Sequence, residues 1–518
     1  MSFAKIKSTL IKSKFVKGAV ILSIGAVLCK LIGAVYRVPL TNILGSEGMG
    51  LYQLIYPIFT LLLVVSSSGI PNGISRLISE KIALGQRAYV KRIIKVSILL
   101  MVVVGLVMSF IMYFFADDIA YMQGNPLASS GYKTIAPSIL FVALISVFRG
   151  IFQGQNNMTP TAVSQIIEQT VKLVLGLGLG YLALGSGIQY GVAGALLGIT
   201  IGELLSLVYL AIQYSTNKRL LVYISRDNFV PSHFKVIKEI IKVVFPITLA
   251  SVFMPIILVV DSVLLVNLLQ SSGLSVSQAT SDYGLYSGIA NTVINMPVVV
   301  ASALATVLVP TMCAYLVNNQ KELATSKVNS AFESIMFVAV PCFFVFLLFG
   351  GDIVEFLFPS VIDDNNYNMS KMLMIVGSIN VLLISIVQVT ASILQCVNKL
   401  WVPALGMFVG CLIKIGISIL LVGSMGILAG MIASVMCYLI VAIINLRYVN
   451  EELDIKLAYL PICLSVSAIC IAISYIIKFF LYDMLGVWGS VLGIGLGAGI
   501  YLFILWILYT KRKVFVTN

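Results

Sequence analysis

Ionisable side chains interrupt several runs of apolar residues that are each long enough to cross a lipid bilayer. These intramembrane residues are Lys30, Arg37, Glu168, Lys172, Glu203, Asp261 and Lys414. Because a charged side chain at the bilayer centre costs roughly 3 kcal/mol on insertion scales, we expect these groups to be paired, hydrated, or both. Basic groups at several depths would line a wet, net-positive cavity. Such a cavity suits an anionic substrate, whereas a cation exporter would need an excess of acids.

Helical spacing puts some of these charges on shared faces. Lys30 and Arg37 are two turns apart on one helix, so both face the same side. Glu168 precedes Lys172 by one turn and shares its face. Asp261 falls in the outer half of its helix, where we expect it to pair with Arg37 or Lys30 when the cavity is empty.

Each charge also has a purely structural interpretation. Arg37 could extend to the outer head groups, and Glu168 with Lys172 could form an ion pair that only stabilises the helix. Glu203 could bind a hydroxyl or backbone group of a neighbouring helix, and Arg149 could mark the cytoplasmic end of its span. The functional interpretation is favoured because the intramembrane basic groups occur at several depths and in both lobes.

The composition is that of a polytopic membrane protein. The chain has 518 residues, of which 60% are hydrophobic and only 10% are charged, and soluble domains of ordinary size cannot bury so much apolar surface. We predict an all-α fold with about fourteen transmembrane helices, each about 20 residues long. The expected spans are 17–40, 50–72, 93–115, 133–152, 160–183, 189–213, 241–269, 284–316, 328–350, 371–396, 402–422, 426–447, 457–479 and 486–510.

The charge distribution predicts the orientation. The net charge is +13, and most Lys and Arg residues fall in cytoplasmic loops when the N-terminus is placed in the cytoplasm, which satisfies the positive-inside rule with an even number of spans. We therefore expect both termini in the cytoplasm of a bacterial cell and a protein embedded in the cell membrane. Attraction to anionic membrane lipids is a secondary effect, and nucleic-acid binding is not indicated.

Residues that commonly bind metals show no suitable pattern. The eight cysteines lie in or beside apolar helices without CxxC pairs, so we interpret them as small core residues and neither as disulfides nor as metal ligands. His233 lies in a predicted cytoplasmic loop. We expect no metal site, no cofactor and no catalytic constellation.

Internal similarity indicates a duplicated architecture. The stretch "GMGLYQLIYP" resembles "DYGLYSGIAN" further along the chain, so that Tyr52 corresponds to Tyr286. A second pair of similar stretches, "FQGQNNMTPTAVSQIIEQTVKLVLGL" and "LQCVNKLWVPALGMFVGCLIKIGISIL", makes Lys172 correspond to Lys414. The repeat covers six spans, an even number, so the copies should be related by a pseudo-two-fold axis along the membrane normal.

This repeat predicts two six-helix lobes followed by two additional helices. The expected divisions are a basic N-terminus (1–16), an N-lobe (17–213), a cytoplasmic linker (214–240), a C-lobe (241–447), a C-terminal helix pair (448–510) and a basic tail (511–518).

Two stretches near the N-terminus carry a resemblance to a known family. The runs "GAVLCKLIGAVYRVPLTNILGSEGMGLYQLIYP" and "SSSGIPNGISRLISEKIALGQ" resemble the opening helices of the stage V sporulation protein B and polysaccharide-biosynthesis branch of the MOP exporter superfamily. That branch is similar to the lipid II flippases of the bacterial cell wall, and its fold is MATE-like. The resemblance implies two six-helix lobes in a V, with the last two helices forming a groove for a lipid tail.

The resemblance also implies roles for particular residues. Lys30 stands where the family usually has arginine in an R-x-x-G pattern, Gly33 is the matching glycine, and Arg37 matches a second basic position. These cations would meet the pyrophosphate of the substrate, helped by Lys172 and Lys414. Arg76 matches a basic position that would guard the cytoplasmic entrance, while Asp261, Glu168, Glu203 and Arg149 would serve gating or charge pairing.

The function that follows is alternating-access flipping of an undecaprenyl-pyrophosphate-linked saccharide, with lipid II as the first candidate, in peptidoglycan synthesis. Its partners would be the lipid-linked oligosaccharide, membrane lipids and cell-wall synthesis proteins, and a coupling cation or the membrane potential would drive it. The alternatives are a flippase for another lipid-linked polysaccharide, for example in sporulation, and a cation-coupled multidrug exporter. A membrane glycosyltransferase would need external carboxylates, for which the candidates are Asp117, Asp118, Asp352, Glu355, Asp363 and Asp364.

Overall fold

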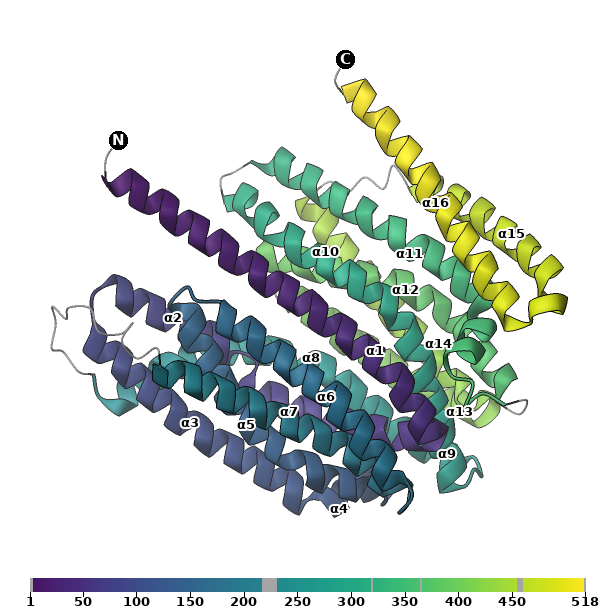
Figure 1. The fold of residues 1–518 in the computed structure, drawn as a ribbon, viewed down its shortest axis with the longest axis horizontal. Coiled ribbons are helices and arrows are strands. Elements are labelled where there is room, and N and C mark those ends of the chain that lie inside the picture. Colours follow the sequence, from purple (N-terminus) through teal and green to yellow (C-terminus); the bar gives the residue numbers. More distant parts are fainter. Residues whose placement is uncertain are drawn as a thin grey trace. The chain divides into compact units, whose positions relative to one another are not determined.

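The computed structural model describes residues 3–216, 231–317, 320–363, 366–397, 399, 401–453 and 460–516. Within these ranges the fold is all-α (Figure 1). Most of the expected linker 214–240 lies outside the described residues, as do the side chains of the two basic terminal segments, 1–16 and 511–518. The helices are α1 (Phe3–Ser67), α2 (Ile70–Ala83), α3 (Arg87–Phe114), α4 (Ala116–Met122), α5 (Ala128–Gly154), α6 (Thr159–Leu184), α7 (Ile188–Thr216), α8 (His233–Ser271), α9 (Val276–Tyr283), the π-helix η2 (Gly284–Ala290), α10 (Asn291–Val317), α11 (Lys321–Leu357), α12 (Tyr367–Cys396), α13 (Trp401–Met425), α14 (Leu428–Glu452), α15 (Leu460–Leu485) and α16 (Val487–Val516).

The helices confirm the predicted polytopic membrane fold. Among the described residues, 12 helical segments are long and apolar enough to cross a membrane. The first, Gly25–Ala83, contains the expected span 50–72 and most of the expected span 17–40. The chain bends between them at Gly45, where φ is 73° and ψ is −178°, a backbone conformation that glycine adopts without strain. This bend lets one long helix supply two differently directed segments.

The chain divides into two compact units. Unit 1 comprises Met1–Gln270 and Leu274–Ser281, and unit 2 comprises Ser271–Gly273 and Asp282–Asn518. The first unit therefore extends well beyond residue 213, where the sequence analysis ended the N-lobe, and includes α8, which was expected in the C-lobe.

Packing explains why α8 belongs to unit 1. Val236 and Ile240 of α8 are fully or almost fully buried in one hydrophobic cluster with residues of α2, α3 and α5. The hydroxyl of Tyr89 on α3 donates hydrogen bonds to the carboxylate of Glu239 on α8, at 2.7 and 2.8 Å. A helix that shares a core and a polar contact with α3 stays with that core, whatever its place in the sequence repeat.

Unit 2 has its own core. Val328 and Phe332 of α11 pack with buried residues of α10, α12, α13, α14 and α15 in a single cluster. The last two helices, α15 and α16, pack side by side and against α11 (Figure 1). The predicted C-terminal helix pair is thus present, and α11 anchors it.

One pair of cysteines corrects the sequence analysis. The Sγ atoms of Cys313 on α10 and Cys396 on α12 are bonded, with the two Cα atoms 5.2 Å apart. The expectation that no cysteine forms a disulfide was therefore wrong. The physical reason is that α10 packs against α12, a proximity that residues 83 positions apart do not reveal in sequence.

Candidate functional site

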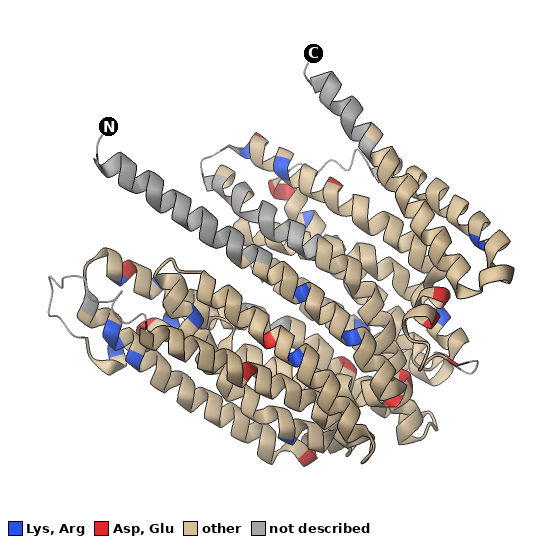
Figure 2. Ribbon diagram, viewed as in Figure 1, with Lys and Arg blue, Asp and Glu red and all other residues tan. Residues whose placement is uncertain are grey.

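Basic residues occur along the described part of α1, away from its ends (Figure 2). Lys30 is exposed and Arg37 is half-buried. Between them in sequence, Tyr36 is only 1% exposed. The helix thus buries Tyr36 against its neighbours, while the two cations on either side of it in sequence are less buried.

Lys172 lies among tyrosine rings of α1. Its ammonium nitrogen is 4.9 Å from the ring centroid of Tyr36 and 5.7 Å from that of Tyr56. The rings of Tyr52 and Tyr56 stack with their centroids 5.8 Å apart. Tyr36 precedes the bend at Gly45 and the other two tyrosines follow it, so both halves of α1 contribute to this site. We call Tyr36, Tyr52, Tyr56 and Lys172 the tyrosine box.

Arg37 and Lys172 approach each other at the tyrosine box. Their positive charges interact, and the charge of Lys172 also interacts with Tyr52, Tyr56 and Glu168. Two cations held close together on neighbouring helices repel each other, and an anion between them would relieve that repulsion. The structure thus brings together two of the sequence-predicted basic residues, on α1 and α6.

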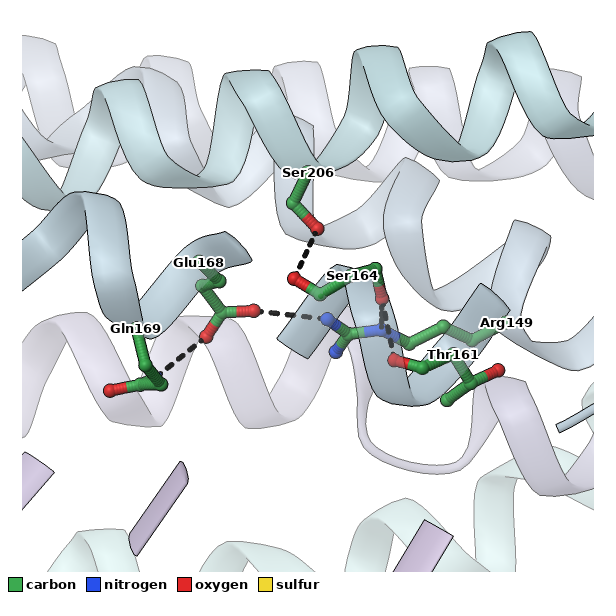
Figure 3. A network of polar contacts seen from close by, with 6 residues as sticks. All are labelled: Arg149, Thr161, Ser164, Glu168, Gln169 and Ser206. Carbon is green, nitrogen blue, oxygen red and sulfur yellow. Dashed lines mark hydrogen bonds and ion pairs between the residues drawn. The ribbon is translucent and has the colours of Figure 1, made fainter. Parts of the chain in front are cut away.

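Glu168 forms its ion pair with a different partner from the one expected. Its Oε2 atom accepts a hydrogen bond from Nη2 of Arg149 on α5 at 3.0 Å, and its Oε1 atom accepts one from Nε2 of Gln169 at 3.1 Å. Nε of Arg149 also donates to Oγ of Ser164 at 3.1 Å. Figure 3 shows the network. Arg149 is therefore more than a marker of a helix end, because it joins α5 to α6.

The remaining predicted residues of unit 1 lie on α2, α7 and α8. Glu203 on α7 is 6% exposed and Asp261 on α8 is 7% exposed, so both acids are buried. Arg76 is exposed on α2. Glu203 interacts electrostatically with Glu168, Arg149 and Lys172.

Lys414 occupies a comparable position in unit 2. It is 3% exposed, and its ammonium donates a hydrogen bond to the hydroxyl of Tyr286 on η2 at 3.5 Å. The Tyr286 hydroxyl is also 2.7 Å from Oγ of Ser434 on α14. Burial gives this lysine a structural setting within its unit, which differs from the exposed setting of Lys30.

Two of the carboxylates considered for a glycosyltransferase are ion-paired with lysines. Asp117 accepts hydrogen bonds from Lys133 and Ser129, and these contacts hold its pKa below the usual range. Asp352 is buried and ion-paired with Lys478 at 2.5 Å. Asp364 lies outside the described residues.

The described residues were also considered as metal ligands. Among the described residues there is no group of three or more His, Cys, Asp and Glu side chains that could hold a metal ion.

The tyrosines are the part of the site that the sequence analysis missed. Tyr52 and its repeat counterpart Tyr286 were noted only as evidence of duplication. Lysine and tyrosine recur together in both repeats, and this co-occurrence was the signal that could have paired them before the structure was known.

Taken together, the fold and the buried charges define a multi-pass helical membrane protein of the carrier type. The sequence matches the polysaccharide biosynthesis protein family over residues 15–316. The chain belongs to this family.

Curated relatives and solved structures agree with that assignment. The stage V sporulation protein B of Bacillus subtilis (strain 168) is 26% identical over 475 residues, covering 90% of this chain and 90% of that protein. Lipid II flippase MurJ of the same organism is 24% identical over 445 residues, covering 82% of this chain and 81% of that protein.

Among solved structures, lipid II flippase MurJ in an inward closed conformation aligns with a TM-score of 0.72 and 17% identity, covering 95% of this chain and 100% of that one. An inward-facing multidrug resistance MATE family transporter of the MOP superfamily aligns with a TM-score of 0.67 and 16% identity, covering 84% of this chain and 97% of that one. The family match over residues 15–316 confirms the predicted resemblance to polysaccharide-biosynthesis proteins, and the two structures agree with the predicted fold. At such identities the two structures establish the fold and no more.

Proposed function

We propose that the chain is an alternating-access flippase that moves a lipid-linked saccharide from the inner to the outer leaflet of a bacterial cell membrane. In its most specific form the substrate is an undecaprenyl-pyrophosphate-linked saccharide, with the peptidoglycan precursor lipid II as the first candidate. The similarity to lipid II flippase MurJ over most of the chain supports this choice. Flipping makes and breaks no covalent bond, so the chain would be a transporter and not an enzyme.

The proposal is carried by the position of Lys172 in the tyrosine box, where its charge also interacts with that of Arg37. The pyrophosphate of this substrate is a diester and therefore a compact dianion, and paired cations bind it by charge-assisted hydrogen bonds. Arg37 offers a planar fork of donors that matches phosphate oxygens, whereas a lysine acts as a point charge. Lys30, exposed on the same helix, would be the first cation that an entering head group meets.

Other predicted residues take secondary roles in this scheme. Arg76, exposed on α2, would guard the cytoplasmic entrance. Lys414, which is buried against Tyr286, would hold η2 in place and reach the substrate only after a rearrangement of unit 2. Asp261 would compensate a basic residue of the empty cavity.

The setting follows from the same proposal. Both termini would lie in the cytoplasm, and the partners would be the lipid-linked saccharide, the surrounding membrane lipids and proteins of cell-wall synthesis. The driving force would be a coupling cation or the membrane potential.

A second candidate is a flippase for a different lipid-linked saccharide, such as one made during sporulation. The similarity to stage V sporulation protein B, which extends over 90% of both chains, favours it. A cation-coupled multidrug exporter is less well supported, because the two charged residues with described side chains before the bend of α1 at Gly45, Lys30 and Arg37, are both basic.

Complementation tests the proposal. The endogenous lipid II flippase of a bacterium is depleted, this chain is expressed, and lipid II on the outer leaflet is measured. We expect rescue by the unmodified chain and none by the double variant Lys30→Ala/Arg37→Ala. The matched control is Lys133→Ala/Arg447→Ala, which removes the same two residue types from exposed ion pairs.

The outcomes separate the candidates. Equal rescue by both double variants would contradict the role of the α1 cations. No rescue by a well-expressed, membrane-inserted chain would contradict lipid II as the substrate and direct the assay to other polyprenyl-linked saccharides.

A further inference from the structure

Glu203 is a buried acid whose carboxyl group is incompletely satisfied. It lies on α7 and is only 6% exposed, and its Oε2 atom has no hydrogen-bond partner among the described residues. An ionised carboxylate without a compensating donor is very costly in a low-dielectric interior, and such groups become neutral instead. For a carboxyl group, becoming neutral means binding a proton.

The charged and titratable groups around Glu203 come from three helices. Helix α7 packs against α6, α5 and α1. Glu168 and Lys172 face Glu203 from α6, and Arg149 faces it from α5. Cys29 on α1 lies close enough to interact with Glu168 and Arg149. The charged groups of this set are two acids and two cations. Which acid lacks a compensating charge therefore depends on which groups Arg149 and Lys172 contact.

Both cations are engaged elsewhere. The guanidinium of Arg149 donates to Glu168 at 3.0 Å and to Ser164 at 3.1 Å (Figure 3). The ammonium of Lys172 lies over the ring of Tyr36, 4.9 Å from its centroid. The described residues show no ion pair between either cation and Glu203. Glu168 is thus the compensated acid and Glu203 is not.

The carboxyl groups of the two acids lie close enough to interact electrostatically. Ionised carboxylates only accept hydrogen bonds, so a hydrogen bond between two carboxyl groups requires a proton on one of them. Helices α6 and α7 pack closely beside the two acids, since a Cβ atom added at Gly202 would lie 3.0 Å from the carbonyl oxygen of Glu168, and the described residues hold no group of three or more His, Cys, Asp and Glu side chains suited to a metal ion. Hard cations need six or more oxygen ligands, which favours the proton.

We propose that Glu203 and Glu168 form a proton-binding site inside unit 1, in which Glu203 carries the proton and Glu168 stays ionised against Arg149. When Glu203 binds the proton, one O–H bond of a hydronium ion breaks as one O–H bond forms at the carboxylate, and release reverses this exchange. Arg149 is the group placed to take over when the proton leaves, since its guanidinium has five N–H donors and already lies between α5 and α6.

Infrared spectroscopy of the full chain in lipid vesicles tests the site directly. Protonated carboxylic acids have a carbonyl stretching band that carboxylates lack. We expect a component of this band from Glu203 at neutral pH, the disappearance of this component as the pH is raised, and its absence from Glu203→Gln. Asp117→Asn is the matched control, because Asp117 is exposed and paired with Lys133, and it should leave the band unchanged.

A second variant, Glu168→Gln, keeps the proposal testable if Glu203→Gln does not fold. Glu168→Gln removes the charge that occupies Arg149, so Arg149 becomes available to Glu203, which should then ionise and lose its component of the band. Persistence of this component in a folded Glu203→Gln protein would overturn the proposal. So would the absence of this component from the unmodified chain at neutral pH, or its removal by sodium ions at constant pH, which would indicate a metal-cation site.

The consequence for transport rests on the proposed function. If the chain flips a lipid-linked saccharide, Glu203→Gln should abolish the acceleration of flipping by a pH gradient while leaving the slower flipping seen without one. The infrared result does not depend on flipping. A proton site without flipping would therefore contradict the proposed function alone, and flipping without the infrared component of Glu203 would contradict the proton site alone.

Discussion

The ammonium of Lys414 lies 3.5 Å from the hydroxyl oxygen of Tyr286 in unit 2, and in unit 1 the charge of Lys172 interacts with Tyr52. The internal repeat pairs these two lysines with each other and these two tyrosines with each other. The same lysine–tyrosine relationship therefore occurs once in each unit. The two settings differ in burial, since Lys414 is 3% exposed while Lys172 is half-buried.

The tyrosine box gives the first prediction. Lys172→Met keeps the length of the side chain but removes its charge, so we expect at least about a tenfold loss of flipping, corresponding to about 1.4 kcal/mol of binding energy. Lys172→Arg keeps the charge and should retain a larger share of the activity. The measurement is lipid transport in vesicles at equal protein content. Equal activity in the unmodified chain and Lys172→Met would show that this cation does not meet the substrate.

Lys414 gives a prediction about stability. Tyr286→Phe removes a hydroxyl group that accepts from Lys414 and contacts Ser434. Losing a buried hydrogen-bond partner costs about 1–3 kcal/mol, so the variant should melt at a lower temperature than the unmodified chain. Tyr121→Phe is the matched control, since Tyr121 is 79% exposed and should melt normally. An unchanged melting temperature for Tyr286→Phe would mean that the hydrogen bond is not formed in the membrane.

The attachment of the last two helices gives a third prediction. Asp352 on α11 is 4% exposed and accepts hydrogen bonds from Lys478 on α15 at 2.5 Å and from Ser490 on α16 at 2.6 Å. Breaking a buried ion pair by removing one partner costs about 3–5 kcal/mol. We expect Asp352→Ala to loosen α15 and α16 and to increase protease cleavage between α14 and α15.

A double variant checks the cause of that effect. Asp352→Leu/Lys478→Met removes both charges and should recover much of the stability, because no uncompensated charge remains. If the double variant were as unstable as Asp352→Ala, loss of shape and not loss of the ion pair would be responsible. Lys133→Ala, which breaks the exposed pair with Asp117, should change protease cleavage little.

Close packing of α6 and α7 gives a fourth prediction. A Cβ atom added at Gly198 would lie 2.3 Å from the backbone nitrogen of Gly176 and 2.4 Å from its Cα atom. Backbone atoms cannot move aside as a flexible side chain can, so Gly198→Ala should separate the helices and lower the yield of folded protein. Gly178→Ala is the matched control on α6, where an added Cβ would meet nothing within 4 Å. A normal yield of monodisperse Gly198→Ala protein would contradict this packing.

Hydropathy and charge spacing were sufficient for the class of protein and for most helices. Whether a stretch such as Trp401–Met425 is a membrane-spanning helix depends on its own apolar length, which is a local property. The presence of basic residues inside the first helix is local in the same sense. The sequence by itself therefore determined an all-α membrane fold, its internal repeat and the list of intramembrane charges.

Only the tertiary structure decided which groups meet. Glu168 was expected beside Lys172, one turn away on its own helix, but its ion pair is with Arg149 on α5. Cys313 bonds to Cys396, although nothing in their spacing indicated it. Which residues become partners depends on how helices that are distant in sequence pack against one another. This packing is a property of the whole fold, because every buried charge must find a partner at the same time as the helices pack together.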